Sequence, residues 1–333
     1  MNRFLIIRQD KVGDVVLLTP LIQAIKTIFP KSFIAVYVKD FMKDILTGNP
    51  NIDEIIPVNE NIYKSTKSIF HESNKLRRYK FDYALIPMPE KEIAYLTFLA
   101  FIPRRITFSR KLFNIITCSK ILIKNFNPPR HESDYMLDFA RYFDKNIIPT
   151  SPKIYLNQNN SEFANKYFQE NNFNLSKSII AVNPGSGGSV SNWSTDNYVE
   201  LVKSLSQTHQ IFINIGPSEI KLKNIFEEIK NDNIIIASPS LKDLISLISK
   251  CSVLISSSTG TMHIAAALNI PTITFFCPQK VCSPTVWGAI GNEATNLIAS
   301  QNYCFDICNE NKLKCTLSEI KVDDVIKIIK SKY

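Results

Sequence analysis

Short runs of β-branched and aromatic residues alternate along the first half of the chain with longer segments in which apolar residues recur at helical spacing. The first pattern is typical of buried strands and the second of amphipathic helices, so their alternation predicts a parallel sheet covered by helices. The predicted strands are Phe4–Arg8, Phe33–Val38, Glu54–Val58, Tyr83–Pro87 and Arg105–Phe108. Helices are expected over Asp14–Phe29, where Pro30 ends the pattern, and over Glu90–Phe101.

The second half repeats the alternation after a polar stretch at 151–177, which is rich in Asn, Gln, Ser and Lys and is predicted to be a linker with one helix at Glu162–Glu170. The strands expected beyond it are Ile179–Asn183, Gln210–Ile215, Ile234–Ala237, Val253–Ser256 and Thr272–Phe276, and the helices are Thr195–Gln207, Ser218–Lys230, Leu241–Lys250, Met262–Leu268 and Leu317–Lys330.

The fold class that these patterns indicate is α/β, with two doubly wound, Rossmann-like domains facing each other across a cleft. The expected domains are 1–150 and 178–316, joined by the linker at 151–177. The last segment, 317–333, is expected to be a helix that packs back on the N-terminal domain. A ligand would bind at the carboxyl ends of the two sheets.

Composition narrows the classes of partner. The 333 residues are 45% hydrophobic and 21% charged, which excludes a disordered or fibrous protein. A net charge of +9 favours anionic partners such as phosphorylated metabolites and lipid headgroups. The basic residues are scattered and no nucleic-acid recognition motif is present, so nucleic acid is not expected. No run approaches the roughly 18–20 apolar residues of a membrane span, so we expect a cytoplasmic protein that at most lies against the inner face of the membrane.

The cysteines do not indicate a metal centre. Of the seven, Cys304, Cys308 and Cys315 follow a C-x3-C-x6-C spacing, and Cys277 and Cys282 precede them. This spacing matches no strong zinc pattern, so buried or exposed thiols are expected rather than a metal site.

The first candidate for chemistry is the turn from Arg8 to Asp14 that follows the first strand. Gly13 permits an unusual backbone angle, and Asp14 opens a helix. Asp14 either caps this helix or, at the carboxyl edge of the sheet, serves as a general base. Lys11 belongs to the same loop. The three glycines of a dinucleotide fingerprint are missing, which weakens a nucleotide-linked oxidoreductase.

Two glycine- and hydroxyl-rich loops form the second group of candidates. Asn183-Pro184-Gly185-Ser186-Gly187-Gly188-Ser189 follows one strand, and Ser258-Thr259-Gly260-Thr261-Met262-His263 follows another. Glycines allow the backbone to approach a ligand, while hydroxyls and free N–H groups at a helix start bind phosphate oxygens. The alternatives are a flexible loop for the first motif and a histidine bonded to the backbone for the second. Glu219 can accept hydrogen bonds from ribose or act in a helix cap with Ser218.

In order and spacing, these motifs resemble the family of bacterial ADP-heptose:lipopolysaccharide heptosyltransferases, glycosyltransferase family 9. The resemblance covers nearly the whole chain. It is carried by Gly13-Asp14 with the run Leu17–Pro20, by Asn183-Pro184-Gly185-Ser186 leading to Trp193, and by Thr259-Gly260-x-x-His263 leading to Pro271.

The resemblance implies a GT-B fold and inverting transfer without metal or cofactor, with Asp14 as the general base. The N-terminal domain would bind an anionic lipopolysaccharide-core or related glycan acceptor, with Lys11 and Gly13 in the acceptor-side loop. The C-terminal domain would bind a nucleoside-diphosphate sugar, most simply ADP-heptose. Its donor-binding residues would be Ser186, Gly187, Gly188, Ser189, Glu219, Ser258, Thr259, Gly260, Thr261 and His263.

Two positions depart from the family pattern. Ser191 stands where many relatives have a Lys two residues before the Trp, and Ser258 stands where they have an Asp that is expected to contact the donor sugar. The second replacement bears directly on heptose as the donor sugar. The alternative function is therefore a non-catalytic or altered-donor sugar-nucleotide-binding protein of the same fold.

Overall fold

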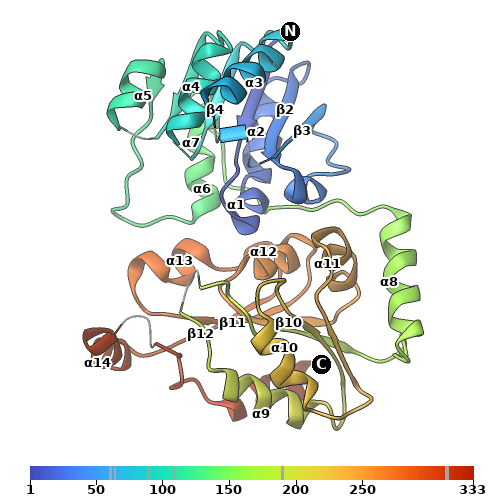
Figure 1. Cartoon of the computed structure of the whole chain (residues 1–333). Helices are drawn as coiled ribbons and strands as arrows, with labels where there is room; N and C mark the ends of the chain where they lie inside the picture. The colour runs from blue at the N-terminus through green and yellow to red at the C-terminus, as the bar shows by residue number, and fades with distance from the viewer. Residues whose placement is uncertain (60–61, 64, 89, 109, 189–190, 312–314) are drawn as a thin grey trace. The chain divides into compact units, whose positions relative to one another are not determined.

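The computed structural model describes residues 1–59, 62–63, 65–88, 90–108, 110–188, 191–311 and 315–333. They form two compact units, 1–155 and 156–333, and each unit contains a six-stranded parallel sheet with helices packed around it (Figure 1). Among the described residues, no helix combines the length and the apolar character that crossing a membrane requires.

In the first unit the strands lie in the order β3-β2-β1-β4-β5-β6, and every pair is parallel. The strands are β1 (Arg3–Ile7), β2 (Phe33–Lys39), β3 (Glu54–Val58), β4 (Tyr83–Ile86), β5 (Arg104–Thr107) and β6 (Lys120–Ile121). The helices are α1 (Val12–Val16), α2 (Thr19–Ile28), the 3-10 helix η1 (Asp40–Ile45), α3 (Thr66–Arg78), α4 (Lys91–Leu99), α5 (Leu112–Thr117), α6 (Glu132–Met136) and α7 (Asp138–Arg141).

The second unit repeats this topology with the order β12-β11-β10-β7-β8-β9. Its strands are β7 (Ile179–Asn183), β8 (Gln210–Asn214), β9 (Ile234–Ala237), β10 (Val253–Ser257), β11 (Thr272–Phe276) and β12 (Ala294–Ile298). Its helices are α8 (Gln158–Glu170), α9 (Thr195–Leu205), α10 (Ile220–Glu227), α11 (Leu241–Ile248), α12 (Gly260–Ala267), the 3-10 helix η3 (Lys280–Cys282), α13 (Pro284–Trp287), α14 (Gln301–Asn311) and α15 (Val322–Lys332).

In both sheets the first strand of the unit is central. Four of the five residues of β1 and all five of β7 are buried, because helices cover both faces of the sheet at that place. A strand buried on both faces is a continuous apolar run, which is why these two strands are evident from the sequence. The chain leaves the central strand toward one edge and later returns to the other side. This creates the topological switch point at which doubly wound folds bind ligands.

About half of the segment 151–177 forms α8, which contains the predicted helix Glu162–Glu170 and belongs to the second unit. Ala164 and Phe168 of α8 are fully buried, and α8 packs on α11. The Phe168 ring meets Phe212 of β8 edge-on at 5.7 Å and stacks on Phe173 at 5.8 Å. The polar composition describes only the exposed face of the helix. Two or three apolar residues are enough to anchor the other face.

The C-terminal helix, α15, packs on α9 within the second unit, where Val325 and Ile329 are fully buried. They share this core with Trp193, whose Nε1 donates to the carbonyl oxygen of Ile320 at 2.9 Å. The expected packing of this helix on the N-terminal domain stays a prediction. An apolar stripe on a helix predicts burial but does not name the surface that buries it.

The helix predicted over Asp14–Phe29 is in fact two helices. The first, α1, ends at Val16, and α2 begins at Thr19 with Pro20 in its first turn. Proline has no N–H to donate, so it is tolerated in the first turn of a helix but not in its middle.

Strands β6 and β12 were not predicted. Both lie at sheet edges, and β6 is only two residues long.

Helix α8 offers an internal test of its place in the second unit. We expect Phe168→Ala to lower the free energy of unfolding by about 3–5 kcal/mol, because it leaves a cavity beside Phe173 and Phe212. Phe163 lies on the same helix and is 38% exposed, so Phe163→Ala should cost less than about 1 kcal/mol. Urea denaturation of both variants measures the difference. Equal effects would show that 158–170 is a loosely attached linker after all.

Candidate active site

In the first unit, the loop after the central strand β1 brings Asp14 to the carboxyl edge of the sheet. Asp14 is in the first turn of α1, but it does not cap that helix. The N-cap residue is Lys11, an exposed side chain that makes no capping hydrogen bond. The Asp14 carboxylate instead accepts a hydrogen bond from Arg8 Nη2 at 2.5 Å. Gly13 lies inside α1 and is not among the glycines with positive φ, so the turn does not use the backbone freedom of glycine there.

The Arg8–Asp14 pair is almost completely withdrawn from solvent, with 5% of Arg8 and 7% of Asp14 exposed. Burial raises the pKa of Asp14 to about 7, against the opposing effect of the positive charge on Arg8. The carboxylates of Asp10 and Glu132 raise the pKa of Asp14 further. A carboxyl group with a pKa near neutrality is suited to accept and release a proton at physiological pH.

Residues distant in the sequence also lie around the Arg8–Asp14 pair. Glu132 of α6 is buried and forms an ion pair with Lys124 Nζ at 2.7 Å. Arg8 Nη1 contacts Met136 Sδ at 3.4 Å, and Arg8 Nε donates to Asp10 Oδ1 at 2.7 Å. Sequence reasoning missed the contribution of Glu132, because more than a hundred positions separate it from Asp14 and no pattern links them.

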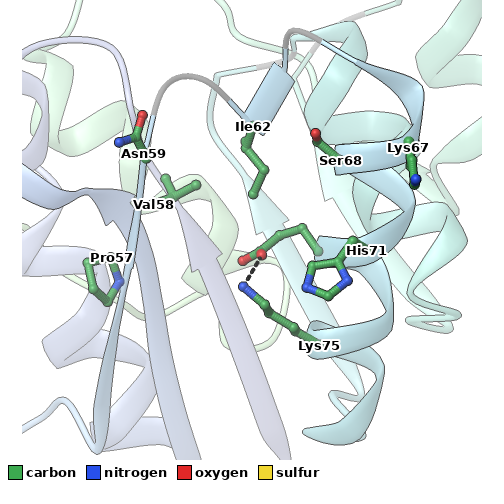
Figure 2. A pocket seen from close by; sticks show the side chains of 9 residues that line it. Pro57, Val58, Asn59, Ile62, Lys67, Ser68, His71 and Lys75 are labelled. Atoms are coloured by element: carbon green, nitrogen blue, oxygen red, sulfur yellow. Dashed lines mark ion pairs between the residues drawn. The ribbon is translucent and has the colours of Figure 1, made fainter.

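A pocket of about 530 Å³ opens beside the end of β3 in the same unit (Figure 2). Its walls are the strand end at Pro57 and Val58 and one face of α3. From α3 come Lys67, His71 and the ion pair between Lys75 Nζ and Glu72 Oε2 at 2.9 Å. The pocket therefore combines an apolar wall with the charged side chains of α3, and nothing in the sequence analysis identified it.

In the second unit, Asn183 joins the ends of three strands. It is the last residue of β7, and its Oδ1 accepts from Asn214 Nδ2 at 2.6 Å and from Thr261 Oγ1 at 3.1 Å. Its Nδ2 donates to the carbonyl oxygen of Gly185 at 2.7 Å. Thus one buried amide holds together the loops that follow β7, β8 and β10. Asn183 was part of a motif, but its role as a connector depends on strand order.

The glycine-rich loop after β7 needs glycine at two positions. Gly187 and Gly188 have φ of +57° and +70°, a region that side chains disfavour. The N–H of Gly187 donates to Glu219 Oε1 at 3.1 Å. Ser186 lies in the same loop, while Ser189 lies outside the described residues.

Glu219 connects this loop to the one that follows β8. Its Oε2 accepts from the N–H of Gly216 at 3.0 Å, so one carboxylate binds backbone groups of two loops. A Cβ at Gly185 would lie 1.9 Å from Oε2, so this contact requires glycine. Glu219 is the N-cap residue of α10 without capping through its side chain, and Ser218 does not form the expected cap with it. Its contact with ribose remains a prediction.

The loop after β10 leads directly into α12, whose N-terminus has no side-chain cap. Thr259 is the N-cap residue, and its Oγ1 is buried without a hydrogen-bond partner in the part of the chain that the structure describes. Gly260 begins the helix and Ser258 precedes the cap. A helix start with free N–H groups and an unused hydroxyl is suited to an anion.

Two other residues of that motif are buried. Thr261 donates to Asn183, and His263 is 5% exposed in the first turn of α12. Ser257 Oγ, at the end of β10, donates to Asn192 Oδ1 at 2.6 Å and accepts from the Trp193 N–H at 3.1 Å. The segment containing Ser191 is therefore fixed to the end of β10, although the sequence analysis assigned Ser257 no role.

Cys277, Cys304 and Cys315 share one hydrophobic core of the second unit, whereas Cys118 lies in the first unit. Cys277 and Cys304 are buried with their Sγ atoms 3.7 Å apart, beyond the roughly 2.05 Å of a disulfide bond. The side chain of Cys308 is outside the described part of the chain. Among the residues described, no group of three His, Cys, Asp or Glu side chains could hold a metal ion.

Comparison with known proteins places the chain in the family that its motifs resemble. Residues 70–316 match the family model described as glycosyltransferase family 9 (heptosyltransferase). A putative glycosyltransferase of Haemophilus influenzae is 25% identical, over 98% of this chain and 95% of its own length. Lipooligosaccharide heptosyltransferase 2 of Campylobacter jejuni is 24% identical, over 96% of this chain and 95% of its own.

Solved structures agree on the fold. A family 9 glycosyl transferase from Veillonella parvula superposes with a TM-score of 0.87 at 19% identity, covering 99% of this chain and 96% of the other. The ADP-heptose lipopolysaccharide heptosyltransferase II of Escherichia coli superposes with a TM-score of 0.81 at 18% identity, covering 99% and 98%. The predicted α/β class and GT-B fold are thereby confirmed. Because the family model spans most of the chain, this protein belongs to glycosyltransferase family 9 (heptosyltransferase) and is a glycosyltransferase.

Proposed function

We propose that the protein transfers a sugar, heptose in the first instance, from a nucleoside-diphosphate donor to a lipopolysaccharide-core or related glycan acceptor. The acceptor hydroxyl oxygen forms the new bond to the anomeric carbon as the bond from that carbon to the diphosphate breaks, with inversion. Asp14 takes the hydroxyl proton, and the nucleoside diphosphate leaves. The observation that carries the proposal is the buried Asp14 carboxyl, with a pKa of about 7, at the carboxyl edge of the first sheet.

The donor side rests on the loops that Asn183 and Glu219 hold together. Backbone N–H groups at the start of α12 and the hydroxyl of Thr259 supply donors for diphosphate oxygens, whose charge grows as the leaving group departs. This arrangement needs no metal. The nucleotide is proposed to be ADP, because the E. coli heptosyltransferase WaaC, a structural relative with a TM-score of 0.74, was solved with ADP.

On the acceptor side, the pocket beside β3 offers Lys67 and His71 to the phosphate or carboxylate groups of an anionic glycan. Lys11, an exposed residue of the loop after β1, adds a further positive charge. Ser258 in place of the family's Asp makes the donor sugar the part of the proposal that most needs a direct assay.

Asp14→Asn tests the general base. The amide keeps the shape of the side chain but cannot accept the proton, so we expect the rate of transfer to fall by about 10²–10⁴-fold while ADP affinity stays within about twofold. Release of ADP from ADP-heptose in the presence of acceptor measures the rate, and calorimetry measures the affinity. Undiminished transfer would assign the base elsewhere. Donor binding with no transfer by the wild-type protein would favour a binding protein.

The pH profile tests the charges around Asp14. Deprotonated Asp14 is the active form, so kcat/KM should rise as the pH passes through about 7. Arg8→Gln removes the charge that lowers the pKa of Asp14 and should move the inflection to higher pH. Asp10→Asn removes a charge that raises this pKa and should move it to lower pH. If the two substitutions only damaged the structure, kcat/KM would fall in both variants, and the inflections of their pH profiles would not shift in opposite directions.

Thr259→Val tests the donor site, with Thr274→Val as its matched control. Both hydroxyls are buried and lack a hydrogen-bond partner in the described part of the protein, so neither change should lower the melting temperature without ligand. Thr274 lies within β11, away from the loops. We expect only Thr259→Val to weaken ADP binding, by about tenfold, in a calorimetric titration. Equal affinities in both variants would remove Thr259 from the site.

A further inference from the structure

Helix α5 buries its two polar residues and exposes three of its four apolar ones. Asn114 and Thr117 are 0% and 1% exposed, whereas Leu112, Ile115 and Ile116 are 73%, 57% and 68% exposed. A helix on the surface of a globular protein normally has the opposite arrangement. Such an inversion costs hydrophobic free energy in water, so it points to a surface that is covered when the protein functions.

A neighbouring helix extends this apolar surface. Helix α4 packs beside α5 (Figure 1), and its Phe98 is 45% exposed. The Arg105 guanidinium lies 5.3 Å from the centre of the Phe98 ring and also donates to the carbonyl oxygens of Ile102 and Thr117. Arg105 thus holds Phe98 next to the end of α5. We call Phe98, Leu112, Ile115 and Ile116 the α4–α5 patch.

The segment that contains the patch is strongly basic. Residues 93–131 include seven Lys and Arg but no Asp or Glu, and the whole chain has an excess of only nine. Within the segment, Lys124 and Arg130 form ion pairs with Glu132 and Asp138. The other five are Arg104, Arg105, Arg110, Lys111 and Lys120, and all but Arg105 are exposed. Arg110 and Lys111 come immediately before α5, and Lys120 follows it closely.

This combination fits an anionic lipid surface. Apolar side chains of an interfacial helix enter the boundary between headgroups and acyl chains, while flanking cations contact the lipid phosphates. A second copy of the chain fits less well. A symmetric dimer would place the patch against itself and bring the cations of both copies together. We propose that the α4–α5 patch docks the first unit on a membrane that contains anionic lipids.

Vesicle sedimentation tests the proposal on the full-length protein. The probe is a phosphatidylcholine vesicle with or without about 30% phosphatidylglycerol and without any glycan acceptor. Binding should require the anionic lipid and weaken as NaCl rises from about 0.05 to 0.5 M. The variant L112S/I115S/I116S should bind at least about tenfold more weakly, because it loses the apolar contribution.

The matched control is I148S/V281S/F305S, which removes three apolar side chains that are 75%, 68% and 68% exposed outside the patch. It should bind vesicles like the wild-type protein. If the first variant does not fold, R110E/K111E reverses charge beside α5 without touching its apolar residues, and it should also lose binding to anionic vesicles.

Three results would overturn the proposal. One is equal binding of the wild-type protein to neutral and anionic vesicles. Another is unchanged binding by the α5 variant. The third is self-association in light scattering that the α5 variant abolishes in the absence of vesicle binding, which would assign the patch to a second copy. Because the vesicles lack acceptor and donor, each result is independent of whether the protein transfers heptose.

Discussion

Parallel pairing of every strand within each sheet is the constraint from which the site derives its geometry. It brings the loops after all strands of a unit to one edge, and the order 3-2-1-4-5-6 separates the helices that follow the first and fourth strands. In the second unit, Asn183 at the end of β7 uses this arrangement by bonding to Asn214 at the end of β8 and to Thr261 in the first turn of α12, which follows β10. In the first unit, the same geometry places Asp14 at the edge immediately after β1.

Burial changes the chemistry of these edge residues. Asp14 next to Arg8 in open solvent would be an ordinary ionised carboxylate. Withdrawn from water, with Asp10 and Glu132 near it, the group has a pKa of about 7 even though a guanidinium lies 2.5 Å away. Glu219 shows another outcome, because its carboxylate is held by backbone N–H groups of two loops and orders the glycines around it. Acidic residues at equivalent edges of the two sheets therefore have different roles: burial raises the pKa of Asp14, whereas Glu219 orders two loops.

The surface of the first unit has an unusual feature on helix α5. Helix α5 buries Asn114 and exposes three aliphatic side chains within a segment, 93–131, that contains seven Lys and Arg but no Asp or Glu. Exposed apolar residues neither stabilise the isolated unit nor make it more soluble. Their presence on α5 is explained if they contact lipid. The sequence analysis allowed at most a peripheral contact with a membrane, and the structure shows where exposed apolar residues and cations come together.

The sequence by itself determined the α/β class, the central strands and the motifs of the family. Buried parallel strands are apolar throughout, and glycines at positive φ have no good substitute, so both leave local signals. Edge strands such as β6 were missed, and the packing of α8 and α15 within the second unit is decided by a few buried residues such as Phe168. Only the tertiary structure could bring Glu132 to Asp14 or assign Asn183 its three partners. Contacts between segments far apart in the chain depend on strand order, and no local pattern of residues encodes that order.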